Sequence, residues 1–356
     1  MLNNKPTFII YESRFNYLSA FIKYKKLKSI KLTNKKLSSI VEWQIEHFYK
    51  IYSSNLFLGE IIWFYSFITF LEDNNYPYIH CGSDVDFFKS YKELQDKSCY
   101  LIVDQFTSPK IIQQLDISKV KLYCMSFWEI CDSDNKSKKI KMNCIDDLGY
   151  DINNQLLSLK QVLTPNPYSK ANQFLGYNLT ILPSINKTIY KQIGLLWGKS
   201  LEYINIPLVK YLCSKGIKFY STTDISINIK GVIHLGYLST ELWYQILHDV
   251  KFILGFGTPV SGPTILEALY YKTPIIAPSK QLNPYIDDNL YCIENYIDAV
   301  INFNNKPSEI LINLIENDYT KILGLINYIE FRENTINKEL YCPKQFEKRF
   351  NTIFSL

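Results

Sequence analysis

The sequence predicts an α/β protein made of two Rossmann-like, doubly wound domains. The chain has 356 residues, enough for two ordinary domains, and 47% of them are hydrophobic. Short apolar runs of strand length alternate with longer segments of helical periodicity in both halves. Such alternation predicts right-handed crossover connections and a parallel sheet in each half.

The first half is expected to form an N-terminal domain over residues 1–185. Its apolar runs have the length of buried strands, and apolar residues recur at helical spacing between them. Pro165, Pro167 and Pro183 indicate a linker region near its end. The expected strands are 7–11, 77–80, 100–103 and 121–125, and the expected helices are 36–52 and 59–71.

The second half alternates more regularly and is expected to form a second domain over residues 186–325. A C-terminal helical segment, 326–356, is expected to pack back onto the first domain. The expected strands are 194–197, 218–220, 232–233, 250–256 and 275–277, and the expected helices are 201–213, 239–248 and 263–271.

The most informative stretch runs from residue 250 to 278. After an apolar strand, Gly257 and Gly262 break the pattern, and Pro263 stands where proline suits the first turn of a helix. Such a helix N-terminus binds anions, because unpaired backbone N–H groups and the helix dipole face the ligand. Glu267, one turn further, would repel phosphate but can accept two hydrogen bonds from a ribose diol. Together these features indicate a nucleotide-sugar site.

The same stretch resembles the donor site of the GT-B glycosyltransferases. Residues 255–263, GFGTPVSGP, followed by Leu266-Glu267-Ala268, look most like the N-acetylglucosaminyltransferase V family, the inverting α-1,6-mannosylglycoprotein 6-β-N-acetylglucosaminyltransferases. The resemblance is dense from 191 to 278 and implies a GT-B fold with an interdomain cleft. It also implies that residues 1–185 form the acceptor-side domain and residues 186–325 the nucleotide-sugar (donor) domain. Further segments agree in the same order along the chain: LGE at 58–60, NQFLGY at 172–177, WGK at 197–199 and HLGYLS at 234–239.

The resemblance also implies which residues bind the donor. Glu267 would hold the ribose, Lys199 would neutralise the diphosphate, and Ser261 stands where the family usually carries a glutamate. Glu267 and Lys199 each have a purely structural alternative, a solvated helix glutamate and an ordinary surface lysine. The other expected donor contacts, whose alternative is turn or capping chemistry, are Tyr220, Ser221, Gly236, Leu238, Gly257, Gly262 and Pro263.

Glu60 matches the family's catalytic carboxylate. Inversion needs one base that takes the proton of the acceptor hydroxyl while positive groups stabilise the leaving diphosphate. Glu60 follows Gly59 at a helix start, where the helix dipole by itself also favours a glutamate. Retaining GT-B enzymes often carry an acid eight positions before the ribose glutamate. Pro259 occupies that position here, which favours inversion.

A metal site is the main competing interpretation. Asp84-Val85-Asp86 is a DxD triplet, the motif with which GT-A glycosyltransferases hold a divalent ion against a diphosphate. Ser83 and Asp84 also read as the N-terminal cap of a helix. We expect the cap rather than a metal site.

The net charge, the cysteines and the apolar runs of the chain indicate which partners and which cellular compartment to expect. A net charge of +5 gives no indication of nucleic-acid binding, and the eight cysteines contain no CxxC pair, as expected of free thiols. No run has the length of a signal peptide core or a membrane span. We therefore expect a cytoplasmic protein, or a Golgi protein if an anchor has been removed, since the family's animal members are Golgi-anchored.

The predicted activity is the inverting transfer of GlcNAc from UDP-GlcNAc to a glycan or glycoprotein hydroxyl, without metal or cofactor. The expected partners are a nucleotide sugar and a glycan. The alternatives are a GT-A-type transferase that uses Asp84 and Asp86, a sugar-nucleotide hydrolase or epimerase, and an inactive glycan-binding homologue.

Overall fold

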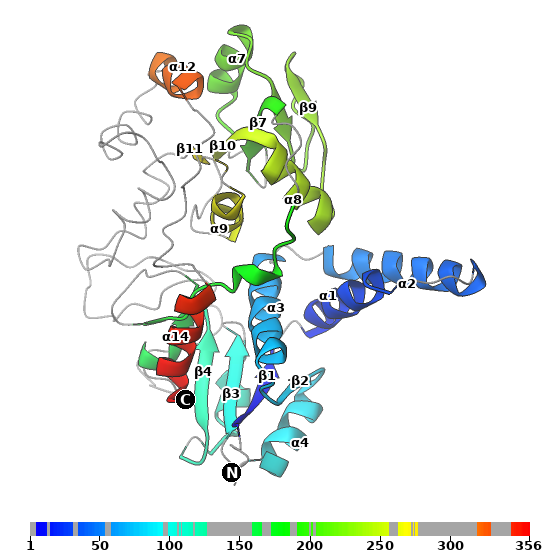
Figure 1. Cartoon of the computed structure of the whole chain (residues 1–356), viewed down its shortest axis with the longest axis vertical. Helices are drawn as coiled ribbons and strands as arrows, with labels where there is room; N and C mark the ends of the chain where they lie inside the picture. The colour runs from blue at the N-terminus through cyan, green and yellow to red at the C-terminus, as the bar shows by residue number, and fades with distance from the viewer. Residues whose placement is uncertain are drawn as a thin grey trace. The chain divides into compact units, whose positions relative to one another are not determined.

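The computed structural model divides the chain into two compact units (Figure 1). Unit 1 comprises Met1–Asn178 and Phe346–Leu356, and unit 2 comprises Leu179–Gln345. The residues that the structure describes are 5–12, 15–30, 35–53, 58–94, 99–104, 107, 109–116, 118–126, 159–165, 172–185, 191–198, 201, 204–255, 263–271, 273, 275–276, 319–328 and 343–356.

Within these residues, unit 1 has a six-stranded sheet in which every pair of neighbouring strands is parallel. The strand order is β2-β1-β3-β4-β5-β6. All six residues of β3 are buried, as expected of a strand covered on both faces. The strands are β1 (Thr7–Tyr11), β2 (Tyr78–Cys81), β3 (Cys99–Asp104), β4 (Lys121–Met125), β5 (Val162–Thr164) and β6 (Gln173–Phe174).

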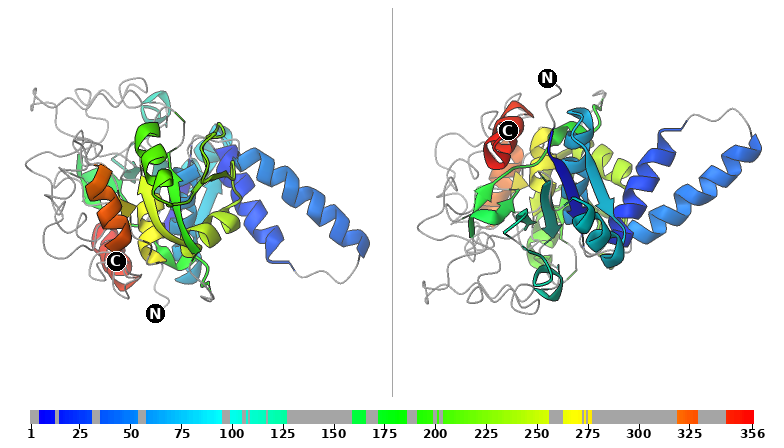
Figure 2. Two further views of the ribbon diagram at one scale, coloured as in Figure 1. Left: turned by 90° about the horizontal axis from the view of Figure 1, so that it is seen from above. Right: turned by 90° about the horizontal axis from the view of Figure 1, so that it is seen from below.

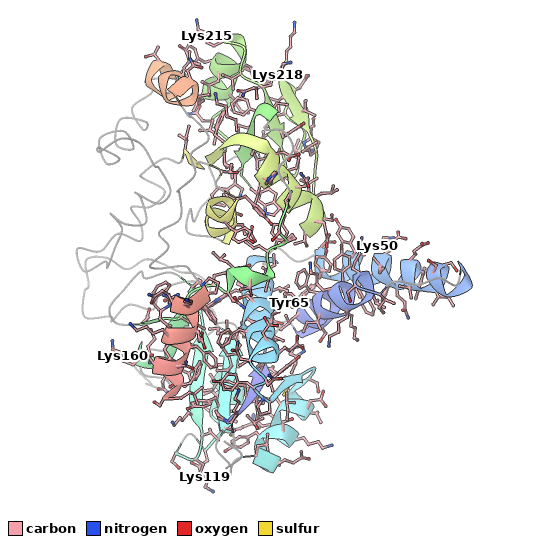
Figure 3. All side chains as sticks on the ribbon, in the orientation of Figure 1. Lys50, Tyr65, Lys119, Lys160, Lys215 and Lys218 are labelled. Atoms are coloured by element: carbon pink, nitrogen blue, oxygen red, sulfur yellow. The ribbon has the colours of Figure 1, made fainter. Side chains whose placement is uncertain are left out.

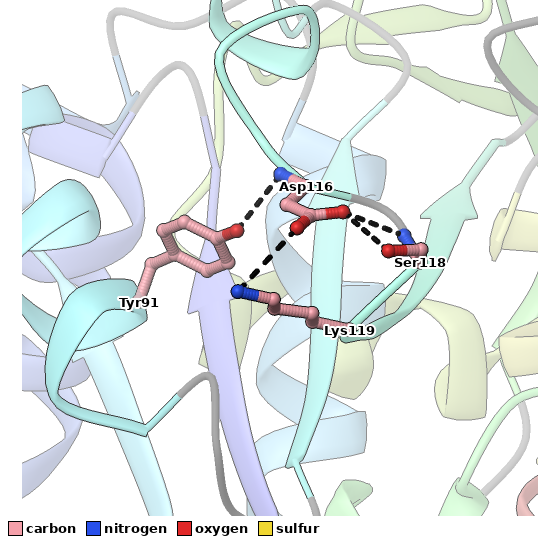
Figure 4. Close-up of polar contacts among 4 residues, drawn as sticks. All are labelled: Tyr91, Asp116, Ser118 and Lys119. Carbon is pink, nitrogen blue, oxygen red and sulfur yellow. Dashed lines mark hydrogen bonds and ion pairs between the residues drawn. The ribbon is translucent and has the colours of Figure 1, made fainter.

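Helices cover both faces of this sheet. α4 (Asp84–Leu94) and α5 (Pro109–Ile112) pack on the face that carries Ile9 and Leu101. The turn before β4 is tied to α4, because the Asp116 amide donates to the Tyr91 hydroxyl at 2.8 Å (Figure 4). Ser118 donates to the Asp116 carboxylate, and these hydrogen bonds lower the pKa of Asp116.

α3 (Leu58–Asp73) is the central helix of the opposite face. Its sequence is apolar almost throughout, which is typical of a helix buried on all sides, and Trp63, Phe67 and Leu71 are buried. The Trp63 indole N–H donates to the carbonyl oxygen of Gly176 at 2.8 Å. Gly176 has a φ of +95°, a left-handed conformation that glycine adopts without strain.

The C-terminal helix α14 (Pro343–Phe354) completes the same face of unit 1. Phe350 and Phe354 lie 5.6 and 5.1 Å from the Phe8 ring, measured between centroids. The Tyr123 hydroxyl donates to the carbonyl of Ile353 at 3.1 Å, and Arg349 Nε donates to the carbonyl of Leu175 at 2.8 Å. A helix from the far end of the chain therefore supplies part of the core of unit 1.

Two further helices of unit 1, α1 (Phe15–Lys28) and α2 (Lys35–Ser53), form a helical hairpin. Aromatic rings join them: Phe21 and Tyr24 each lie 5.0 Å from Tyr52 between ring centroids. Figure 2 shows that the hairpin extends away from the sheet of unit 1.

The described part of unit 2 has a five-stranded parallel sheet in the order β11-β10-β7-β8-β9. Numbered along the unit, this is the 3-2-1-4-5 order of a Rossmann fold. Strands are added in opposite directions from β7, so right-handed crossovers place helices on both faces. The strands are β7 (Lys191–Trp197), β8 (Phe219–Ser221), β9 (Val232–His234), β10 (Val250–Gly255) and β11 (Ile275–Ile276), and the helices are α7 (Ile206–Ser214), α8 (Thr240–Asp249), α9 (Pro263–Tyr270) and α12 (Tyr319–Tyr328).

The expected fold class is confirmed, because both units are α/β with a parallel sheet. Some element boundaries were wrong. The helix expected from residue 201 begins at Ile206, since Asn205 caps it by accepting from the Leu208 amide at 3.1 Å. The region expected as a linker, from Pro165 to Pro183, contains β6, and β5 ends directly before it at Thr164. The division between the units falls at Asn178, where residue 185 was expected. Of the C-terminal segment 326–356 that was expected to pack back onto the first domain, Phe346–Leu356 belongs to unit 1.

Among the described helices, none combines the length and apolar character needed to cross a membrane.

Candidate functional site

The strand order of unit 2 creates one place where neighbouring strands lead away in opposite directions. β7 and β10 lie side by side there, with Leu196 paired to Leu254 and Trp197 paired to Gly255. Ligands of open α/β sheets bind beyond the carboxyl ends of the strands at such a switch point. The two segments expected to bind the diphosphate, at Lys199 and at 257–262, directly follow these strand ends in sequence.

Gly194 allows the close packing beneath this point. A Cβ atom there would lie 2.6 Å from Phe252 Cζ and 2.9 Å from the Phe219 ring, closer than real Cβ contacts. The two rings meet edge to face at 5.9 Å between centroids. Glycine at this position of β7 therefore leaves room for an aromatic ring from β8 and one from β10 to pack over the strand.

α9 begins at Pro263, as expected, and its other end is held by hydrogen bonds within unit 2. The Thr273 amide donates to the carbonyl of Ala268 at 2.8 Å, and its hydroxyl donates to the carbonyl of Leu247 at 2.5 Å. The Tyr271 hydroxyl donates to the carbonyl of Pro183 at 3.0 Å. α9 is thus fixed to α8 and to the first residues of the unit.

Glu267 is the most unusual side chain on α9, because it is a carboxylate with only 2% of its surface exposed. The indole N–H of Trp243, on α8, donates to Glu267 Oε2 at 2.9 Å. Glu267 Oε1 is buried and has no hydrogen-bond partner among the described residues. Burial raises the pKa of Glu267 to about 7. The polar groups of the Trp243 and Tyr244 side chains oppose this rise, because they favour the ionised carboxylate.

The structure therefore excludes the solvated helix glutamate as a description of Glu267. A buried acceptor without a donor is costly, and native proteins rarely leave one unless a ligand or water completes it. Oε1 therefore keeps an acceptor site that no described donor uses.

The loops after β8 and β9 lie further along the same sheet edge, since β8 pairs with both β7 and β9. Ser221 is buried, and its hydroxyl lies 2.8 Å from that of Thr223, so it takes part in the turn. Tyr220 is half-buried. Gly236 has a φ of +67°, and Leu238, two residues later, is half-buried.

Several expected donor residues lie outside the described residues, namely Lys199, Gly257, Ser261 and Gly262. For Pro263 the structure describes the backbone, which begins α9. The described donor candidates Tyr220, Ser221, Gly236, Leu238 and Glu267 all belong to unit 2.

Glu60 belongs to unit 1, in the first turn of α3, and is half-buried. The residues that follow it, Ile61 to Phe64, are buried, so the helix is anchored directly behind the carboxylate.

Asp84 and Asp86 are occupied by structural hydrogen bonds. The Tyr11 hydroxyl donates to Asp84 Oδ1 at 2.5 Å. Ser83 caps α4, since its hydroxyl accepts from the Asp86 amide at 3.1 Å and donates to Asp86 Oδ2 at 2.8 Å. Among the described residues there is no group of three His, Cys, Asp or Glu side chains suited to a metal ion.

Comparison with known proteins gives no match by sequence. No model of a protein family matches the chain, and no curated protein matches it.

Solved structures match over almost the whole chain at low identity. A UDP-GlcNAc 2-epimerase from Methanocaldococcus jannaschii is 11% identical with a TM-score of 0.46, over 99% of this chain and 100% of its own. An α-glucosyltransferase in complex with UDP-glucose and DNA containing an abasic site is 10% identical with a TM-score of 0.46, over 98% and 99%. The calicheamicin glycosyltransferase CalG4 is 9% identical with a TM-score of 0.40, over 99% and 94%. None of these three is an N-acetylglucosaminyltransferase V.

The sequence did not reveal Trp243 as a partner of Glu267. The two residues lie 24 positions apart on successive helices, and no spacing rule links them. The available signal was a tryptophan in the helix that precedes β10, since a buried indole N–H usually finds an acceptor.

Proposed function

We propose that the chain is an inverting, metal-independent glycosyltransferase that transfers GlcNAc from UDP-GlcNAc to a glycan hydroxyl. The donor binds unit 2 beyond the ends of β7 and β10. Glu267 accepts from the ribose, and the N-terminus of α9 together with Lys199 stabilises the diphosphate.

One observation carries this proposal. Glu267 lies on the helix that follows the switch-point strand β10, with one carboxylate oxygen held by Trp243 and the other lacking a partner among the described residues. Trp243 would orient the carboxylate, and a ribose hydroxyl would complete its hydrogen bonds. A carboxylate acceptor makes stronger hydrogen bonds than a neutral group.

Glu60 is the proposed general base. It would take the proton of the acceptor hydroxyl while that oxygen attacks the anomeric carbon from the side opposite the leaving UDP. Backbone N–H groups and a lysine can stabilise the diphosphate without a metal ion.

The binding part is tested by measuring the affinity of UDP for the parent protein and for Glu267→Ala. We expect UDP to raise the melting temperature of the parent, because a ligand of the native state stabilises it. Loss of a charge-assisted hydrogen bond should weaken the binding of UDP by roughly 1.5–3 kcal/mol. Glu347→Ala, at an exposed glutamate of α14, is the control. Equal affinity in parent and Glu267→Ala would refute the donor site.

The reaction part is tested by product analysis of UDP-GlcNAc with and without a glycan acceptor. A transferase forms a β-linked product only when acceptor is present. Free GlcNAc or an epimerised sugar, formed equally without acceptor, would replace the transferase by the hydrolase or epimerase alternative.

A further inference from the structure

The hairpin of α1 and α2 carries a charge out of proportion to the rest of the chain. Residues 15–53 contain eight lysines and two glutamates, a net charge of +6, whereas the whole chain has +5. The remaining residues are thus close to neutral. The modest net charge of the chain conceals a strongly basic segment.

α2 also has an apolar face that its neighbours cover only in part. Of its side chains that the structure describes, 38–53, only Tyr52 is buried. A helix of 19 residues in water normally buries an apolar stripe against other elements. α1 supplies part of that cover through Phe21 and Tyr24.

Large apolar side chains of the hairpin are exposed. Ile30 and Ile40 are each 49% exposed, and Trp43 is 64% exposed with its ring stacked on His47 at 5.5 Å between centroids. Ile30 lies two residues after the end of α1 and Ile40 lies in the second turn of α2, so both are near the end of the hairpin at which α1 ends and α2 begins.

Exposed lysines lie on α1 of the same hairpin. Lys23, Lys26 and Lys28 are exposed on the second half of α1, and Lys28 Nζ lies 5.9 Å from the Tyr24 ring centroid. Lys31, Lys35 and Lys36 follow in sequence. Long lysine side chains can rest along apolar surface while their ammonium groups reach out to anions.

We propose that this hairpin binds the surface of an anionic lipid bilayer. The lysines would meet the negative headgroups, and Ile30, Ile40 and Trp43 would enter the boundary between headgroups and acyl chains. Basic residues combined with exposed Trp and aliphatic residues are typical of helices that lie in this interface. A nucleic acid would satisfy the lysines but would leave Ile30 and Ile40 in water, which favours the lipid surface.

The test is co-sedimentation of the full-length chain with phosphatidylcholine vesicles that contain or lack phosphatidylglycerol. We expect binding to the anionic vesicles only, weakened by salt because the attraction is screened. Each lysine near such a surface contributes about 5-fold to partitioning, so Lys23→Gln/Lys26→Gln/Lys28→Gln should lower it about 100-fold.

The matched control removes three exposed lysines of unit 2, Lys215→Gln/Lys218→Gln/Lys230→Gln; Lys215 and Lys218 are labelled in Figure 3. It should bind the vesicles like the parent, and circular dichroism should show that both triple variants are folded. Equal loss in both variants would mean that total charge, and not the hairpin, governs binding, and would overturn the proposal.

Insertion of the apolar residues is tested separately by fluorescence quenching with brominated lipids. Quenching should occur with the parent and be reduced in Trp43→Phe, because Trp43 is exposed and is the one tryptophan in the hairpin sequence. Absence of vesicle binding, or binding of an oligonucleotide in its place at the same salt concentration, would also overturn the proposal.

Discussion

At the scale of single residues, the pair Glu267 and Trp243 defines the candidate donor site. A carboxylate this deeply buried pays a desolvation cost, which raises its pKa to about 7. The Trp243 hydrogen bond offsets part of the cost and fixes the orientation of the side chain. A ribose hydroxyl would offset more, so donor binding should favour the ionised form.

The raised pKa predicts a specific dependence of stability on pH. In the unfolded chain Glu267 ionises near pH 4.5, whereas in the folded protein it remains protonated until about pH 7. The contribution of Glu267 to the free energy of unfolding is therefore fully present below pH 4.5. It falls by roughly 3 kcal/mol at most as the pH rises to 7. Glu267→Gln cannot ionise, so its free energy of unfolding should lack this decline.

The measurement is denaturant unfolding of both proteins between pH 4.5 and 8, with Glu347→Gln as the exposed control. The difference in unfolding free energy between parent and Glu267→Gln should change with pH in favour of Gln. A constant difference across this range would show that Glu267 ionises normally and is not held as described.

Glu60 is predicted to act on the acceptor and not on the donor. Glu60→Gln keeps shape and hydrogen-bonding capacity but cannot take a proton, and loss of a general base typically lowers the rate about 10²–10⁴-fold. We expect the turnover number to fall while UDP affinity stays close to that of the parent. Glu72→Gln, at an exposed position of the same helix, is the control. Near-parental turnover of Glu60→Gln would remove it as the base.

How far the sequence predicts the site depends on the residue. The strand at 250–256, Pro263 and Glu267 lie close together in the sequence, so this part of the site could be predicted from the sequence alone. The pairing of Trp197 with Gly255 became known only from the structure. The burial of Glu267 could not be predicted, because it depends on how α8 packs against α9. The roles of Glu60 and Lys199 rest on resemblance and stay predictions.

At the scale of elements, α14 is the clearest case of a helix whose role its own sequence does not show. Phe346, Phe350 and Phe354 recur at a spacing of four and indicate one apolar stripe. The stripe alone does not show which strands or helices α14 packs against. In the structure Phe350 contacts the rings of Phe8 and Phe70, on β1 and α3.

This packing predicts that Phe350→Ala destabilises unit 1 strongly. Phe350 is completely buried, and truncation of a buried phenylalanine typically costs about 3–5 kcal/mol. Chemical denaturation should show the loss, while Lys348→Ala, at an exposed position of α14, should change stability little. A Phe350→Ala protein as stable as the parent would mean that α14 does not complete this core.

Buried strands were predicted better than short or basic elements. β1 and β4 were predicted to the residue, because a continuous apolar run bounded by polar residues has few alternatives. α1 was missed since lysines interrupt its apolar positions, and the short strands β5 and β6 were missed because they border or lie in the proline-containing region that was interpreted as a linker. Tertiary pairing decides such elements.

At the scale of the whole molecule, the proposed chemistry needs no metal ion. Asp84 accepts a hydrogen bond from the Tyr11 hydroxyl, and Asp86 accepts one from Ser83, the cap of α4. Both carboxylates of the DxD triplet therefore have structural roles. We expect transfer to continue in excess EDTA at the same rate, and Asp86→Asn to reduce stability rather than turnover. Loss of transfer in EDTA and its recovery with Mn²⁺ would favour the GT-A-type alternative.

The return of α14 to unit 1 has a consequence for the nascent chain. Unit 2 is one continuous stretch, Leu179–Gln345, whereas unit 1 needs residues from before and after it. Domains generally fold during synthesis in the order in which they emerge. Here the unit that the ribosome begins first cannot close its aromatic core until α14 has been made, so it must wait, with Phe8 and Phe70 uncovered, while unit 2 is translated. The unit begun first is completed last, and the interval is the period in which this protein most needs protection from aggregation.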